Sequence, residues 1–330
     1  MISHPDQSLL GRVFDSYQNM MQIAACIREA ANQRSIHQPR VLELSRRETG
    51  LHDYLPEALI ERYATHEDNQ PTINRPLRIP YEDKSFDACL VSDMYEHIPA
   101  EFRPELLSEM LRVTDGLVLL GAPRGNEIVS RFDRVVFDFI WGKYAERFEP
   151  LQQHIEFGLE PVEKTLESFK ALGASDVVIL PCNYVYRWIH QILIYFDLQH
   201  NQSDHTLFES LNRIYNERLS PYDYREPSYR FLIIVATNQE IAINKISEKL
   251  KAPVEVASHV AEADGIMAET FRALDSQATD KLRNQRLEIE HLHRIINHLQ
   301  TDNASITKKF KVLWSKTKWK LRALISTIKS

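Results

Sequence analysis

The sequence predicts an α/β fold: a doubly wound, seven-stranded, mostly parallel sheet, followed by a C-terminal α-helical coiled-coil extension. Three observations predict it. Short β-type segments alternate with helical segments up to about residue 240. The segments CLV, LVLL, VVIL and FLIIV are continuously apolar, as expected of strands that are buried on both faces. From about Asn238 the chain becomes polar and helical and acquires a heptad pattern.

The elements follow from apolar spacing. Seven segments have strand composition: 41–44, 64–67 (the weakest), 77–79, 86–92, 116–122, 176–180 and 229–237. Helical spacing predicts helices near 8–33, 53–62, 101–113, 127–147, 161–173, 185–199 and 205–217.

The C-terminal third has a coiled-coil pattern over 281–313. Apolar residues and one asparagine recur every seven positions at Leu282, Ile289, Ile296, Asn303 and Phe310, with a second series at Leu292, Leu299, Ile306 and Leu313. An asparagine at one core position favours a defined register and a low oligomer number. A homodimer is therefore expected, and a single long helix packed on its own domain is the alternative.

The charge is distributed unevenly. The net charge is −6, yet no acidic residue follows Asp302, and eight basic residues lie in 308–330, so the remainder carries about −14. An apolar stripe containing Trp314 runs along this basic segment. A basic amphipathic helix is typical of attachment to an anionic membrane surface. A solvated helical end or a partner-binding helix is the alternative, and the acidic body disfavours nucleic acid as a partner.

The remaining composition indicates an ordinary globular protein, with 43% hydrophobic and 26% charged residues. Cys26, Cys89 and Cys182 have no zinc-binding spacing, so free thiols and no metal centre are expected. The N-terminus lacks the basic and apolar regions of a secretory signal, and the best apolar run, 231–237, is only strand-sized. We expect a cytoplasmic protein, with peripheral attachment to the inner membrane face through its tail.

Three consecutive segments within 77–123 carry a resemblance. They read IPYEDKSFD, ACLVSDMYEHIP and LLSEMLRVTDGLVLLGAP. In order and spacing they resemble the type 11 methyltransferases of the class I S-adenosylmethionine-dependent superfamily. Weaker similarity over 154–161 and 211–230 is shared with relatives that work in cell-surface polysaccharide assembly.

The resemblance implies an S-adenosylmethionine site at the carboxyl ends of the strands. Glu43 matches the family's acidic residue in the first strand, and Gly50 its last loop glycine. Ser45 and the arginines after it replace the middle glycines, so Arg46 and Arg47 either point away, meet the cofactor carboxylate, or prevent binding. Further cofactor contacts implied by the resemblance are Glu67 or Asp68 for the ribose, Asn74 or Arg75 for the adenine, and Asp93.

Polar residues follow the predicted fourth strand. Asp93, Glu96 and His97 lie where the pocket of this fold forms. A hydroxyl acceptor must lose its proton, and His97 or His154 is the candidate base, with Glu96 or Asp93 orienting it. A structural role for His97 is the alternative. Three residues are further candidates for lining the acceptor side: Tyr184, Arg187 and Trp188. For Trp188, an ordinary place in the core is the alternative.

The sequence therefore predicts a methyltransferase that acts on a saccharide or a glycan precursor. Its segments are an N-terminal helical segment (1–36), a methyltransferase-like domain (37–240), a helical linker (241–280), the coiled coil (281–313) and the basic tail (308–330). A non-catalytic scaffold of this fold in a glycan-assembly complex is the alternative, because the loop glycines are replaced.

Overall fold

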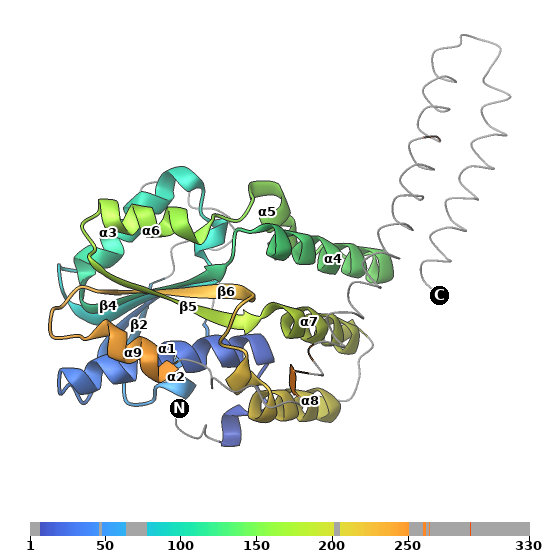
Figure 1. The fold of residues 1–330 in the computed structure, drawn as a ribbon, viewed down its shortest axis with the longest axis horizontal. Helices are drawn as coiled ribbons and strands as arrows, with labels where there is room; N and C mark the ends of the chain where they lie inside the picture. The colour runs from blue at the N-terminus through green and yellow to red at the C-terminus, as the bar shows by residue number, and fades with distance from the viewer. Residues whose placement is uncertain are drawn as a thin grey trace, which may run out of the picture.

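The computed structural model describes residues 7–45, 48–63, 78–200, 205–250, 260, 261, 264 and 291. Within these residues, a twisted sheet is covered by helices on both faces, and a group of helices extends beyond one end of it (Figure 1). The strands are β1 (Arg40–Leu44), β2 (Leu59–Tyr63), β3 (Phe86–Ser92), β4 (Thr114–Pro123), β5 (Asp176–Tyr184) and β6 (Ser228–Ala236). The α-helices are α1 (Phe14–Gln33), α2 (Leu51–Tyr54), α3 (Arg103–Val113), α4 (Glu127–Tyr144), α5 (Glu149–Phe157), α6 (Val162–Ala171), α7 (Val185–His200), α8 (His205–Arg218) and α9 (Ile243–Leu250).

The strands follow the order β2-β1-β3-β4-β6-β5. Neighbouring strands from β2 to β4 pair in parallel, whereas β6 runs antiparallel to both β4 and β5. The predicted doubly wound, mostly parallel α/β sheet is therefore confirmed. Over the described residues it has six strands, so the predicted seven are not confirmed.

The segment between β1 and β3 differs most from the prediction. The helix predicted over 53–62 is wrong: α2 ends at Tyr54 and β2 begins at Leu59. Pro56 explains the difference, because a residue that precedes proline avoids the helical region, and Leu55 leaves it with ψ 59°. The strand predicted at 64–67 lies outside the described residues.

The strand predicted at 77–79 is also not found at residues 78 and 79, which are the part of it that the structure describes. The Ile79 N–H donates to Glu109 Oε2 at 2.8 Å instead of to a neighbouring strand. Farther along the chain, the helix predicted over 127–147 ends at Tyr144, because Ala145 adopts a left-handed backbone with φ 55°. The helix α5, which the sequence did not predict, follows after Phe148.

The two faces of the sheet carry separate apolar clusters. Val41, Leu90 and Leu119 belong to the cluster that packs against α1, α2 and α9. Residues that alternate with them, including Leu42 and Val91, belong to the cluster that packs against α3 and α6 (Figure 1). The N-terminal helix α1 is therefore part of the same core as the sheet.

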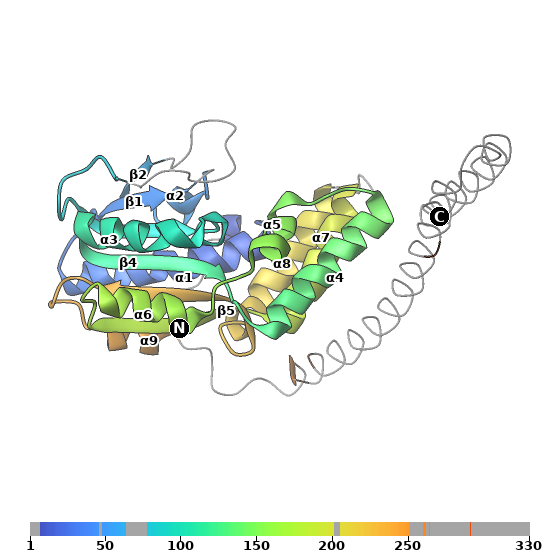
Figure 2. The ribbon, with the colours of Figure 1, turned by 90° about the horizontal axis from the view of Figure 1, so that it is seen from above.

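A third apolar cluster joins α4, α5 and α7, together with Tyr215 of α8 and Phe14 of α1. Figure 2 shows α4, α7 and α8 side by side, beyond the end of the sheet from which β4 and β5 continue into helices. This helical group stands beside the carboxyl ends of the parallel strands.

The C-terminal predictions fall almost entirely outside the described residues. This holds for most of the linker after α9, for the coiled coil (281–313) except His291, and for the tail (308–330), which all stay predictions. Among the described helices, none is long and apolar enough to cross a membrane.

Candidate functional site

The carboxyl ends of β1 and β3 form the switch point of the sheet. From β1 the chain moves outward to β2 and then crosses back to β3 on the other side of β1. Leu44 pairs with Val91, so Ser45 and Ser92 stand at neighbouring strand ends. Doubly wound sheets bind ligands outside the carboxyl ends of their strands at this point.

Two buried polar atoms at the end of β1 have no hydrogen-bond partner among the residues that the structure describes. Glu43 and Ser45 are each only 3% exposed. Within the described residues, neither Glu43 Oε1 nor Ser45 Oγ has a partner. A buried polar atom without a partner is costly, so this end of β1 is suited to a ligand that donates hydrogen bonds.

Ser45 stands where the resembled family has a glycine, and the backbone at this position accepts a serine. Ser45 is not among the residues with positive φ, so serine causes no strain there. Gly50 does have a left-handed backbone, with φ 76°, where it precedes α2. Its visible role is this turn, and its predicted contact with the cofactor stays a prediction.

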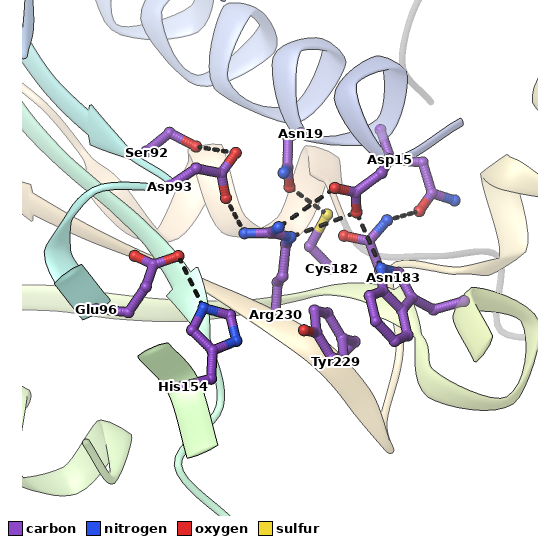
Figure 3. A network of polar contacts seen from close by, with 12 residues as sticks. Asp15, Asn19, Ser92, Asp93, Glu96, His154, Cys182, Asn183, Tyr229 and Arg230 are labelled. Carbon is purple, nitrogen blue, oxygen red and sulfur yellow. Dashed lines mark hydrogen bonds and ion pairs between the residues drawn. The ribbon is translucent and has the colours of Figure 1, made fainter. Parts of the chain in front are cut away.

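Asp93 follows β3 and is paired with an arginine. It has a left-handed backbone, with φ 54°. Its Oδ1 forms an ion pair with Arg230 of β6, and Ser92 Oγ donates to its other oxygen at 3.5 Å (Figure 3). Arg230 also contacts Asp15 of α1, with Nη2 3.2 Å from Oδ2. Arg230 of β6 therefore links Asp93, which follows β3, to Asp15 of α1.

An aromatic pair continues this network. The Trp188 indole stacks on the Tyr229 ring, with centroids 3.4 Å apart and planes at 8°. Trp188 Nε1 donates to Asp15 Oδ1 at 3.2 Å. Tyr229 Oη donates to Asp133 Oδ1 of α4 at 2.6 Å. The helical group is thus joined to the end of the sheet by buried polar contacts.

Asp133 also positions a histidine. His154 Nδ1 of α5 lies 2.9 Å from Asp133 Oδ2. His154 Nε2 then faces Glu96, 3.9 Å from Oε1, as Figure 3 shows. The His97 ring stacks on His154, with centroids 5.4 Å apart and planes at 22°. Glu96 or Asp93 was predicted to orient the base, whether His97 or His154. For His154 the structure adds Asp133, which was not predicted and which contacts Nδ1 while Glu96 faces Nε2.

The Glu96 side chain lies in a buried environment. Burial raises the pKa of its carboxyl to about 7, and the charge of Asp93 adds to the rise. Glu96 Oε2 has no hydrogen-bond partner within the described part of the chain. One ligand atom each of Glu96, His97 and His154 lie within 4.8 Å of one another.

The structure brings the predicted catalytic residues Glu96, His97 and His154 into one cluster. Glu43, Ser45 and Asp93 lie at the ends of the neighbouring strands β1 and β3. Four predicted cofactor contacts lie outside the described residues and stay predictions: Glu67, Asp68, Asn74 and Arg75.

Arg187 was predicted to line the acceptor side, but its side chain is buried in ion pairs and does not line it. Its side chain is 1% exposed and is held by Asp223 and by Asp264, whose Oδ1 lies 2.7 Å from Nε. Arg225 stacks over the Tyr184 ring at 3.9 Å, so Tyr184 belongs to the same ion-pair cluster. Trp188 lies in the network of Asp15 and Tyr229 instead.

Sequence reasoning missed Asp15, Asp133 and Arg230. For Asp133 a signal was present: it falls on the apolar face of α4, four residues after Val129 and three before Val136. A carboxylate on a buried helix face needs a polar partner. Asp15 and Arg230 gave no comparable signal, since their partners lie on distant segments.

No family model and no curated protein matches the chain. Among solved structures it is similar to a methyltransferase of Thermotoga maritima, described as a possible histamine N-methyltransferase, at 8% identity and a TM-score of 0.34, covering 71% of this chain and 100% of that one. A second, from Archaeoglobus fulgidus, is an S-adenosylmethionine-dependent methyltransferase at 14% identity and a TM-score of 0.31, covering 65% and 94%. A third is a phosphoethanolamine N-methyltransferase of Haemonchus contortus in complex with S-adenosylhomocysteine, at 14% identity and a TM-score of 0.32, covering 61% and 49%. These TM-scores are low, and the fold is established by the chain's own strand order.

Proposed function

We propose that this chain is an S-adenosylmethionine-dependent methyltransferase whose cofactor binds at the carboxyl ends of β1 and β3. The observation that carries the proposal is the buried, unpartnered carboxylate oxygen of Glu43 at the switch point of the sheet. The resemblance of segments within 77–123 to type 11 methyltransferases supports it.

The residues present fit this cofactor. Glu43 Oε1 and Ser45 Oγ can accept hydrogen bonds from the ammonium group of its methionine portion. A carboxylate near the cationic sulfonium is also electrostatically favourable. In this proposal Gly50 shapes the loop, Asp93 lines the pocket, Glu67 or Asp68 binds the ribose, and Asn74 or Arg75 meets the adenine.

The proposed acceptor is a hydroxyl group of a saccharide or glycan precursor. When bound, S-adenosylmethionine supplies a methyl group, whose bond to sulfur breaks as the acceptor oxygen bonds to it, leaving S-adenosylhomocysteine and a proton. Glu96, His97 and His154 form the cluster that activates the hydroxyl, and Asp133 holds His154 in place. Alignment of the acceptor oxygen with the methyl–sulfur bond supplies much of the rate.

Cofactor titration tests the proposal. We expect the full chain to bind S-adenosylmethionine and S-adenosylhomocysteine with micromolar affinity in calorimetry. Glu43→Ala should weaken binding about 10- to 100-fold, the effect of one charge-assisted hydrogen bond. The matched control is Glu61→Ala, on the neighbouring strand β2 with its side chain 42% exposed, which should bind as the wild type does. Wild-type affinity in Glu43→Ala contradicts the site.

A second candidate function is a non-catalytic scaffold of the same fold. The replacement of the loop glycines by Ser45, Arg46 and Arg47 favours it, since an arginine beside the sulfonium would repel it. The same titration separates the two candidates, because a scaffold shows no heat of binding at millimolar cofactor.

The C-terminal extension completes the proposal. We infer that 281–313 joins two chains as a coiled coil, and that 308–330 holds the dimer to an anionic membrane surface at the inner membrane face. The support is the heptad pattern together with the eight basic residues of the tail. A glycan precursor carried on a lipid would be presented at that surface.

A further inference from the structure

We propose that Glu96, His97 and His154 bind a divalent first-row transition-metal ion. Their ligand atoms already lie within 4.8 Å of one another, and Glu96 Oε1 lies 3.9 Å from His154 Nε2. Metal–nitrogen and metal–oxygen bonds are roughly 2.0–2.2 Å long, so two ligands of one ion at tetrahedral or octahedral angles lie roughly 3–3.5 Å apart. A closure of about 1–2 Å, within the reach of side-chain rotation, therefore forms the site.

The acceptor atoms of Glu96 and His154 face each other in a way that a cation would stabilise. Because Asp133 Oδ2 lies 2.9 Å from His154 Nδ1, that nitrogen donates a ring proton to the carboxylate. In the neutral form of such a ring, the Nε2 lone pair faces the Glu96 carboxylate. Both His154 Nε2 and Glu96 Oε2 are buried without a hydrogen-bond partner among the described residues. Two acceptors that face each other in a buried site are unfavourable unless a positive charge lies between them.

The distance favours a metal ion over a shared proton. A hydrogen bond between nitrogen and oxygen needs a separation of about 2.7–3.2 Å. The 3.9 Å between His154 Nε2 and Glu96 Oε1 exceeds this range, but it is within about 1 Å of the separation of two ligands on one ion.

Asp133 completes the arrangement as an outer partner. Metal-binding histidines commonly donate their second ring N–H to a carboxylate, which fixes the ring and makes it a better ligand. Asp133 has this position, and Tyr229 Oη holds its other oxygen at 2.6 Å. His154 is therefore presented to the cluster in a fixed orientation.

The donor set selects the class of metal. Two imidazoles and one carboxylate suit zinc, iron, cobalt or manganese better than magnesium or calcium. Three protein ligands leave coordination positions for water or for a hydroxyl, whose pKa the ion lowers. The activation of an acceptor hydroxyl rests on the proposed function, whereas the binding of the ion does not. No metal centre was predicted from the sequence, because the ligands come from two distant segments.

Metal titration of the full chain tests the proposal directly. After treatment with a chelator and dialysis, the protein is titrated with Zn²⁺, Mn²⁺ and Co²⁺ in a calorimeter. We expect one ion per chain for at least Zn²⁺ and Co²⁺, and visible d–d absorption for bound Co²⁺. Failure of the wild type to bind any of the three ions at millimolar concentration overturns the proposal.

Variants locate the bound ion. His154→Ala and His97→Ala should each weaken Zn²⁺ binding at least 100-fold, and Asp133→Asn should weaken it about 10- to 100-fold, as loss of an outer partner does. His37→Ala, an exposed histidine outside the cluster, is the matched control and should bind normally. Circular dichroism verifies that each variant folds. If an alanine variant does not fold, the Zn²⁺ affinity of Asp133→Asn and the Co²⁺ absorption of the wild type test the site instead. Wild-type Zn²⁺ affinity in folded His154→Ala overturns the proposal.

A parallel titration with S-adenosylhomocysteine keeps the two proposals separable. A chain that binds S-adenosylhomocysteine but no metal overturns the metal site alone. A chain that binds the ion but no S-adenosylhomocysteine supports the metal site and contradicts the proposed function.

Discussion

Asp133 connects the two parts of the site. It is 1% exposed and accepts hydrogen bonds from Tyr229 Oη and His154 Nδ1. Asp133→Ala leaves both donors buried without a partner, at a cost of about 1–3 kcal/mol each. We therefore expect urea denaturation to show a loss of about 2–5 kcal/mol of unfolding free energy. Tyr229→Phe, which removes one donor, should cost only about 1 kcal/mol. A loss below about 0.5 kcal/mol in Asp133→Ala would show that the contacts do not stabilise the fold.

Arg230 holds Asp15 and Asp93 together and is 9% exposed. Arg230→Met leaves the Asp15 carboxylate in place without its cation, so the variant should lose about 3 kcal/mol of unfolding free energy. The double variant Arg230→Met, Asp15→Asn should recover part of this loss, because one of the two uncompensated carboxylate charges is gone. Thermal unfolding of the three proteins gives the comparison, and no recovery in the double variant would show that charge pairing is not the cause.

The sequence predicted part of the site at this scale. The segment SDMYEHIP placed Asp93, Glu96 and His97 at a strand end, and the structure confirms that place. Asp133 and Arg230 were missed because their roles depend on partners far along the chain. Tyr229 and Asp133, for example, are 96 residues apart. Local spacing carries no information on such pairs.

At the scale of elements, Gly125 sets the junction between β4 and α4. A Cβ at this position would lie 2.3 Å from the carbonyl carbon of Glu160. Gly125→Ala must therefore move backbone, and we expect it to lose about 1–3 kcal/mol of unfolding free energy in urea. Gly142→Ala is the matched control, since nothing lies within 4 Å of its Cβ in α4 and alanine favours a helix by about 1 kcal/mol. Equal stability of the two variants would contradict the close approach at Gly125.

The fold was predictable where apolar patterns were strong. Continuous apolar runs located β3, β4, β5 and β6, and helical spacing located α1, α3, α6 and α7. The prediction failed at β2, whose residues LIERY have helix-like spacing and pair only as an edge strand. It also failed at α5, a helix that is packed by its neighbours. Both elements depend on tertiary contacts rather than on local pattern.

At the scale of the whole molecule, the chain combines an acidic body with a basic tail. Each basic residue near an anionic leaflet contributes about 1 kcal/mol, so the eight of 308–330 should bind the chain to such vesicles. We expect the full chain to sediment with anionic liposomes, less so at high salt, and a truncation before Thr307 to stay in the supernatant. Equal sedimentation of both proteins would contradict the membrane role of the tail.

The predicted coiled coil over 281–313 should join two chains into a dimer. The full chain should be a dimer in light scattering, and a truncation after residue 280 should be a monomer, because the heptad residues of 281–313 are removed. Asn303→Leu should allow oligomers larger than a dimer to form, since a core asparagine favours a low oligomer number. A monomeric full chain would contradict this prediction.

A crystal structure of the chain with S-adenosylhomocysteine would show whether the cofactor binds at the switch point of the sheet. We expect electron density at the carboxyl ends of β1 and β3, with the ligand's amino group within hydrogen-bonding distance of Glu43 Oε1. Density at another place, or no density at saturating ligand, would contradict the proposed site.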